Sequence, residues 1–205
     1  MSGYEPTPLC AADASKFVRA LTWSNLKSAA GEVRAKLHER VLVFRAGPAA
    51  ESVSGLRQVS QLDANRFGLP YAKETLADNW ANGWGLYAWW DADLPVSFAW
   101  ARVAPEHRIT EVRARVRAAV AVGWIVHCIT PEEFRGRGFY PRLIRGVAGT
   151  LPAPSTYIYC VESNHGSRRG IEKAGYEAVG SVSRTLGRLS ASLRDLTAAG
   201  DLPSA

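Results

Sequence analysis

The stretch FRGRGFY, residues 134–140, is where the sequence most clearly offers chemistry, because it combines two glycines with two arginines. Pro141 follows and opens an apolar run, which predicts the first turn of a helix. The amides at a helix start have no intrahelical acceptor, and the helix dipole favours negative charge there. Glycines let a ligand approach the backbone closely, while Arg135 and Arg137 add positive charge. The stretch therefore predicts a phosphate-binding loop.

Two nucleotide-binding motifs do not fit this loop. The P-loop pattern GxxxxGK[ST] is absent, since no Gly-Lys-Ser/Thr follows. The dinucleotide pattern GxGxxG begins with Gly136 and Gly138 but meets Pro141 at its third glycine. The alternative to a phosphate-binding loop is an ordinary strand-to-helix turn with solvated arginines.

The elements that must position this loop follow from hydrophobic periodicity and from turn residues. They predict a single α/β domain over residues 1–205 with a mixed α+β character. Its mixed central sheet has an antiparallel front half, a crossover unit behind and flanking helices. Strands are expected at 40–47, 56–63, 85–103 (a hairpin turning at 91–93), 111–117, 118–130, 155–162 and 176–184, and helices at 13–38, 71–83, 140–151 and 163–175.

Composition narrows the class of protein. Apolar residues make up 47% of the chain and charged residues 21%, as in globular proteins, and no apolar run is long enough to span a bilayer. We expect a cytoplasmic protein without a membrane partner. The net charge of +6 includes no Lys/Arg block of five or more, which argues against nucleic acid as a partner. Cys10, Cys128 and Cys160 are unpatterned, so neither a disulfide framework nor a metal site is expected.

Two segments in sequence order resemble a known family. CITPEEFRGRGFY, residues 128–140, resembles the coenzyme-binding pattern R/Q-x-x-G-x-G/A of the GNAT acyl-CoA N-acyltransferase superfamily. Arg135 and Gly138 match, Tyr140 replaces the small sixth residue, and the turn after Pro131 is one residue longer than is usual. NHGSRRGIEKAGY, residues 164–176, is similar to the family's second signature. The resemblance covers residues 120–180, extends to 84–103, and makes 84–180 the acyl-CoA-binding core behind a helical N-terminal extension, 1–38.

The resemblance implies acetyl-CoA as the acyl donor and no metal. Its two central strands would splay apart, and the pantetheine arm would pair with the free edge at Cys128 and Ile129. Asn164 and Ser167 would contact that arm further along. The pyrophosphate would lie on the loop and helix start, formed by Arg135, Gly136, Arg137, Gly138, Phe139 and Tyr140.

The catalytic side chains are less clear from the sequence. Many members of the family carry a tyrosine that protonates the thiolate seven residues after the motif's asparagine, and Ile171 occupies that position here. The candidates near the splay are His127, Tyr159 and Glu162, of which histidine titrates in the range that suits a base. His127 as a packed core histidine and Glu162 as a solvated carboxylate are the structural alternatives.

The resemblance implies an N-acetyltransferase that moves an acetyl or short acyl group from coenzyme A to a primary amine by direct attack. A small molecule, such as an amino sugar or an amino-acid-like metabolite, is the expected acceptor, and the protein would be a monomer or a homodimer. A protein or peptide acceptor remains open, as does a catalytically silent coenzyme A-binding module.

Overall fold

A computed structural model describes residues 38–47, 54–67 and 69–200. The helix expected at 13–38 lies outside these residues, except for His38, which begins a strand and not a helix. Cys10 also lies outside them.

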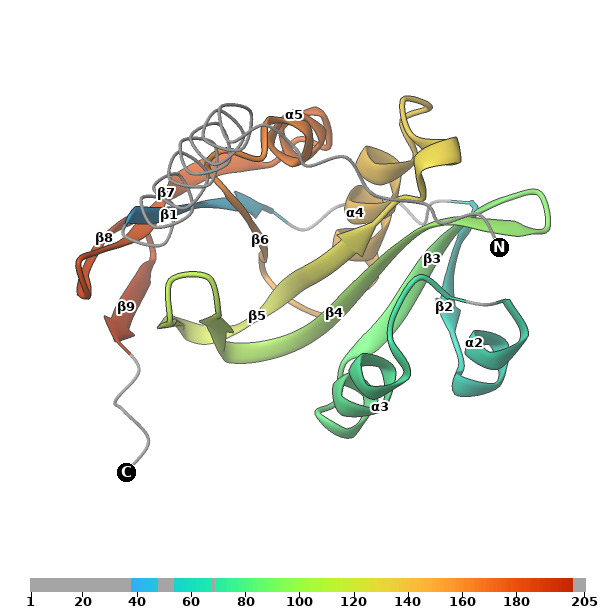
Figure 1. The fold of residues 1–205 in the computed structure, drawn as a ribbon, viewed down its shortest axis with the longest axis horizontal. Coiled ribbons are helices and arrows are strands. Elements are labelled where there is room, and N and C mark those ends of the chain that lie inside the picture. The colour runs from blue at the N-terminus through green and yellow to red at the C-terminus, as the bar shows by residue number, and fades with distance from the viewer. Residues whose placement is uncertain (1–37, 48–53, 68, 201–205) are drawn as a thin grey trace, which may run out of the picture.

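The described strands form one mixed, nine-stranded sheet (Figure 1). Neighbouring strands in this sheet follow the order β2-β3-β4-β5-β6-β1-β7-β8, and β9 pairs with the first part of β5. Every pairing is antiparallel except that of β5 with β6, which is parallel. The predicted mixed α/β architecture is thus confirmed. The strands are β1 His38–Ala46, β2 Leu56–Val59, β3 Gly85–Asp91, β4 Leu94–Ile109, β5 Ala114–Ile129, β6 Thr156–Val161, β7 Glu177–Thr185, β8 Arg188–Leu193 and β9 Leu196–Gly200.

Helix α4 is the crossover that joins the two parallel strands. It buries Leu143, Ile144 and Val147 at helical spacing against Ile125 of β5 and Ile158 of β6. This packing covers one face of the sheet and makes the strand-helix-strand unit that the sequence predicted. The helices are α2 Gln61–Phe67, α3 Lys73–Ala81, α4 Phe139–Thr150 and α5 His165–Lys173, and a short 3-10 turn η1 covers Glu132–Phe134.

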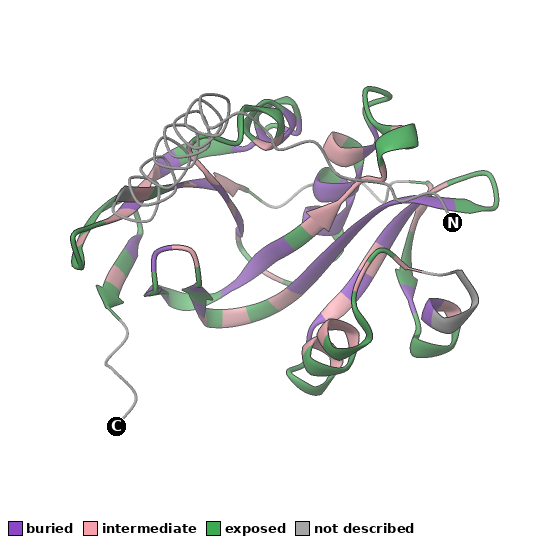
Figure 2. Cartoon of the chain, viewed as in Figure 1, coloured by how far each residue is buried: buried purple, intermediate pink, exposed green. Residues whose placement is uncertain are grey.

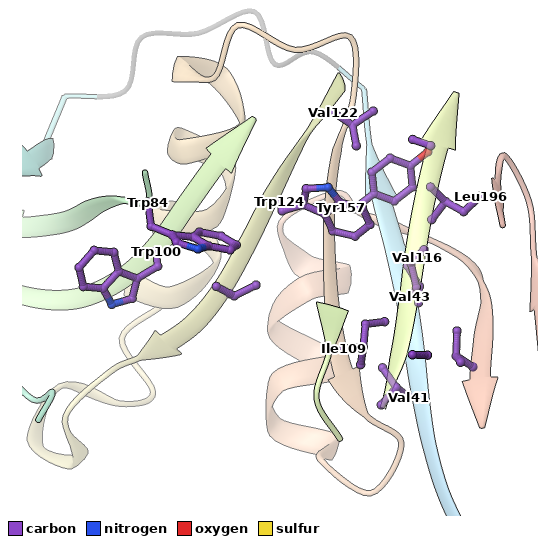
Figure 3. Close-up of a cluster of buried hydrophobic side chains, with 14 of the residues drawn as sticks. Val41, Val43, Trp84, Trp100, Ile109, Val116, Val122, Trp124, Tyr157 and Leu196 are labelled. Carbon is purple, nitrogen blue, oxygen red and sulfur yellow. The ribbon is translucent and has the colours of Figure 1, made fainter. Parts of the chain in front are cut away.

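The opposite face carries a second core, rich in aromatic rings. Trp80 of α3 packs edge-on against the fully buried Trp100 of β4, with ring centroids 5.4 Å apart. Trp84, Trp124 and Tyr157 belong to the same cluster (Figure 3). The sheet therefore separates two environments, one under α4 and one under α3.

Strands β4 and β5 form a hairpin that is much longer than its neighbours (Figure 1). Near its turn, Ala114 and Val116 are buried while Arg115 and Arg117 are exposed, as on a strand with one solvated face. Figure 2 shows buried and exposed residues alternating along this hairpin. Further along, Val122–Val126 is buried throughout, because helices or rings cover both faces. The segments expected at 111–117 and 118–130 are therefore one strand.

Two other segments differ from the predicted elements. The strand expected at 56–63 ends at Val59, and Gln61 begins α2, where Ser60 and Asp63 exchange hydrogen bonds in the first turn. The segment after Thr185, where no element was predicted, forms β8 and β9, because β7 and β5 offer strand edges to pair with. Among the described helices, none is long and apolar enough to cross a membrane.

We predict that Gly123→Ala lowers the free energy of unfolding by about 1–3 kcal/mol, because an added Cβ would lie 2.8 Å from atoms of both Leu151 and Thr156. Urea unfolding measures the change. Gly47→Ala is the matched control, since a Cβ there meets nothing within 4 Å. Equal stability of the two variants would contradict the close approach of β5 and β6 at Gly123.

Candidate functional site

The parallel strands β5 and β6 pair only over a short stretch. Their partners are Gly123 with Thr156, Trp124 with Tyr157, and Ile125 with Ile158. Beyond these pairs β5 stays with β4 and β6 stays with β1, so the two strands diverge (Figure 1). Facing backbone groups at the carboxyl ends of both strands are thus left without a strand partner. An opening between strand ends is where α/β folds place ligands.

A bulge in β5 lies at this divergence. Phe98 pairs with Ile129 and Trp100 with Val126, so one residue of β4 faces both His127 and Cys128. His127 adopts a left-handed backbone with φ of 48°. The extra residue turns Cys128 onto the α4 face, although Val126 faces the aromatic cluster.

Tyr71, in the segment before α3, holds this bulge from outside the strand. Its hydroxyl donates to the carbonyl oxygen of His127 at 2.7 Å. Its ring also packs edge-on against Phe98 and Trp100. Burial raises the pKa of Tyr71 well above its usual value, so the phenol stays protonated and can donate. Sequence reasoning missed this residue, since 56 positions separate it from its partner.

The glycine loop leads directly into α4. Gly136 and Gly138 both have a positive φ, 78° and 76°, and a Cβ at either would meet nothing within 4 Å. The loop backbone is therefore open on its outer side, and Gly138 is the residue that caps the helix. Arg135 donates to the carbonyl of Thr130 at 3.0 Å and stays exposed with its neighbours. Open amides, a helix start and exposed arginines suit an anion.

Tyr140 connects the start of α4 to α5. Its hydroxyl lies 3.1 Å from the hydroxyl oxygen of Ser167, and its ring occupies the place where a Cβ of Gly170 would lie. Asn164 caps α5 by accepting the amide hydrogen of Ser167 at 3.0 Å. The structure thus brings Tyr140, Asn164 and Ser167 together. The bulky Tyr140 is accommodated at the start of α4 because its ring packs against Gly170, while its backbone amide stays at the glycine loop.

The three catalytic candidates lie in different surroundings. Glu162 forms an ion pair with Arg40 at 3.1 Å, and both side chains are nearly half exposed. Tyr159 is partly buried on the aromatic face, where its hydroxyl lies 3.3 Å from Nε2 of His107. His127 is exposed at the bulge. Ile171, at the family's tyrosine position, is fully buried in the core under α4.

His107 is a buried neighbour of the site that sequence reasoning also missed. Its ring lies between those of Trp84, Trp124 and Tyr159, with centroids 5.2–5.6 Å away. Burial, and then the electrostatic effect of the nearby Arg102 and His127, lower the pKa of His107 to about 3. The ring is therefore neutral at physiological pH. It sits in a polar stretch, EHRIT, that gives no sequence signal of burial.

The two described cysteines are free thiols with suppressed ionisation. Part of Cys128 reaches solvent, but burial of its thiol raises the pKa to about 12, and burial also raises the pKa of Cys160. A thiolate nucleophile is therefore disfavoured at both. In the described part of the chain, no group of three His, Cys, Asp or Glu side chains is arranged to hold a metal ion.

The buried His107 predicts a loss of stability in acid. Its pKa is about 6.5 when unfolded and about 3 when folded, so below pH 6.5 protons bind the unfolded chain preferentially. The stability contributed by the neutral ring is complete above pH 6.5 and is lost progressively as the pH falls towards 3. Between pH 7 and pH 5 this loss is about 2 kcal/mol. Urea unfolding at both pH values should show a smaller loss for His107→Gln, and an identical loss would contradict the neutral assignment.

No protein-family model matches the sequence, and a search of curated proteins finds no match. Solved structures do match. A structure from Novosphingobium aromaticivorans assigned to the GNAT acetyltransferase family aligns over 80% of this chain and 66% of its own, with a TM-score of 0.50 and 19% identity. A GNAT-family acetyltransferase from Colwellia psychrerythraea aligns over 71% of this chain and 55% of its own, with a TM-score of 0.52 and 11% identity.

The chain thus spans 66% and 55% of the lengths of these two proteins. At such low sequence identities, the similarity is one of fold. The diverging parallel strands are a feature that the family resemblance of the sequence had implied, and the mixed sheet with its crossover helix is the architecture that the periodicity predicted. The chain has the fold of the GNAT superfamily.

Proposed function

We propose that this protein transfers an acetyl or short acyl group from coenzyme A to a primary amine. The observation that carries the proposal is the divergence of β5 and β6 after Ile125 and Ile158, beside the glycine loop that begins α4. The divergence leaves backbone donors and acceptors for an extended, amide-containing arm. The glycine loop would bind an anion at one end of that arm.

The residues present fit coenzyme A. The loop is open above Gly136 and Gly138, and the exposed Arg135, Arg137 and Arg142 surround it with positive charge. Pyrophosphate oxygens would accept from the amides of residues 137–140, where the helix dipole adds to the attraction. The arm would pair with β5 near Cys128 and Ile129, and Asn164 and Ser167 would lie beside it.

The reaction needs a neutral amine and a protonated leaving thiolate. The amine nitrogen attacks the thioester carbonyl carbon, a C–N bond forms, the C–S bond breaks, and the amine proton leaves to a base. We assign the base to His127, exposed at the bulge, and the proton donor for the thiolate to Tyr159. Burial raises the pKa of Tyr159, so its phenol is protonated and able to donate at neutral pH. Glu162 remains a candidate base, although its carboxylate pairs with Arg40.

A small-molecule amine is the acceptor that we favour. The face of the sheet opposite α4 carries partly exposed aromatic rings, Tyr71, Trp80 and Trp90, which suit an amino sugar or an amino-acid-like metabolite. A release assay for free thiol, run with acetyl-CoA over a panel of small amines and peptides, tests the activity. Firm coenzyme A binding without turnover of any amine would contradict the proposed acyl transfer and would indicate a catalytically silent coenzyme A-binding module.

We predict that Gly138→Asn weakens coenzyme A binding at least about 10-fold while the fold persists. Asparagine tolerates the left-handed backbone at φ 76°, but its side chain would occupy the space where the pyrophosphate approaches. Isothermal titration calorimetry measures the affinity. Gly187→Asn is the matched control, since Gly187 has φ of 81° and open surroundings in the turn between β7 and β8. Unchanged affinity in Gly138→Asn would refute the phosphate-binding loop.

We predict that Tyr159→Phe lowers kcat by about 10²–10⁴-fold with unchanged coenzyme A affinity, because it removes a general acid. Tyr157→Phe is the control, as Tyr157 lies on the same strand and the same face.

The variant His127→Asn should likewise lower kcat and leave coenzyme A affinity unchanged, because asparagine tolerates the left-handed backbone of the bulge. Full turnover in either variant would remove that residue from the mechanism.

A further inference from the structure

Four side-chain nitrogen atoms on α3 and β4 are buried. They are Nδ2 of Asn79, Nε1 of Trp100, Nε of Arg102 and Nδ1 of His107, and none has a partner among the described residues. Buried polar groups are normally paired, since an unpaired one costs about 1–3 kcal/mol. The first three are hydrogen-bond donors, so the group that would satisfy them is an acceptor.

Arg102 is the charged member of this set. Its guanidinium lies over the ring of Trp84, 4.5 Å from the centroid, which fixes its position. Among the described residues, the oxygen that it contacts is the carbonyl oxygen of Asn82, at a long distance of 3.4 Å from Nη1. No carboxylate in the described part of the chain forms an ion pair with Arg102. Other arginines do have such partners, among them Arg40, Arg45, Arg115, Arg117 and Arg168.

Arg102 also lies close to the proposed reaction centre. It pairs in register with Trp124 of β5, one residue before β5 and β6 form their last pair. Trp84, beneath the guanidinium, contacts the ring of His107, and His107 reaches the hydroxyl of Tyr159 (Figure 3 labels Trp84 and Trp124). This cluster lies on the face opposite α4, so it is reached from the side away from the helix that begins at the glycine loop.

We propose that the acceptor amine also carries a carboxylate, and that Arg102, held against Trp84, binds this carboxylate. The surrounding rings then accommodate an apolar or aromatic body. This inference rests on the proposed acyl transfer and specifies its acceptor as an amino acid or an amino-acid-like compound.

Charge balance favours a carboxylate over other groups. One guanidinium beside a neutral histidine compensates a single negative charge, whereas a phosphate dianion would leave a buried charge unpaired. A neutral sugar hydroxyl could accept from the donors but would leave the guanidinium without a counter-charge. A carboxylate meets both requirements, because it accepts several hydrogen bonds and pairs with arginine.

The selectivity of the unaltered protein is the first test. Thiol release is measured with L-phenylalanine, phenylalaninamide and 2-phenylethylamine, and with the corresponding leucine series. We expect the carboxylate member of each series to have a kcat/KM higher by about 10- to 100-fold, the value of a charge-assisted hydrogen bond. Equal or higher kcat/KM for the amide and the decarboxylated amine would overturn the carboxylate assignment and leave acyl transfer intact.

Substitution of Arg102 is the second test. Arg102→Met should raise KM for the carboxylate amines by about 10- to 100-fold and leave the decarboxylated amines unchanged, so that the selectivity disappears. Arg102→Lys should retain part of the selectivity, because lysine keeps the positive charge but lacks the planar guanidinium that can donate two parallel hydrogen bonds. Arg108→Met, which removes an exposed arginine of the same strand, is the control. Coenzyme A affinity should remain unchanged in all three, and selectivity that persists in Arg102→Met would overturn the proposal.

A binding measurement separates this inference from the proposed function. If no amine is turned over, the tryptophan fluorescence of the coenzyme A-loaded protein is titrated with L-phenylalanine and with 2-phenylethylamine. Tighter binding of phenylalanine that is lost in Arg102→Met would support the carboxylate site even though acyl transfer had failed. Equal binding of the two amines would reject it.

Discussion

The rest of the structure depends on the short parallel contact between β5 and β6. Its three residue pairs hold the two halves of the sheet together at Gly123, where only a glycine allows such close approach. Outside this contact each strand has a different partner, β4 on one side and β1 on the other. The strands therefore diverge without losing their own pairing, and a stable fold retains unpaired backbone at its centre.

The bulge at His127 determines what this divergence presents to a ligand. It turns Cys128 under α4 and leaves His127 exposed, so side chains after the bulge face opposite to the regular alternation. A left-handed histidine costs conformational energy, and the hydrogen bond from Tyr71 helps to hold it. The segment before α3 thereby controls the geometry of a strand far away in the sequence.

The two sides of the site differ in charge and in polarity. The loop before α4 is exposed, rich in arginine and aligned with a helix dipole, which suits the anionic end of a nucleotide-like donor. The face under α3 is aromatic, and burial keeps His107 neutral there. That separation suits a reaction in which the amine must lose its proton.

The sequence by itself determined the elements and the loop, because periodicity, Gly138 and Pro141 act over a few residues. It predicted the α4 crossover and the strand at 40–47, and it placed Tyr159 and His127 on strands that end at the site. Only the tertiary structure decided that β1 lies between β6 and β7, and that 186–200 forms strands, since strand pairing is set by distant partners. It also decided that Tyr71, Arg102 and His107 lie on the aromatic face beside the diverging strands. Their contacts cross long sequence separations, and no local pattern encodes them.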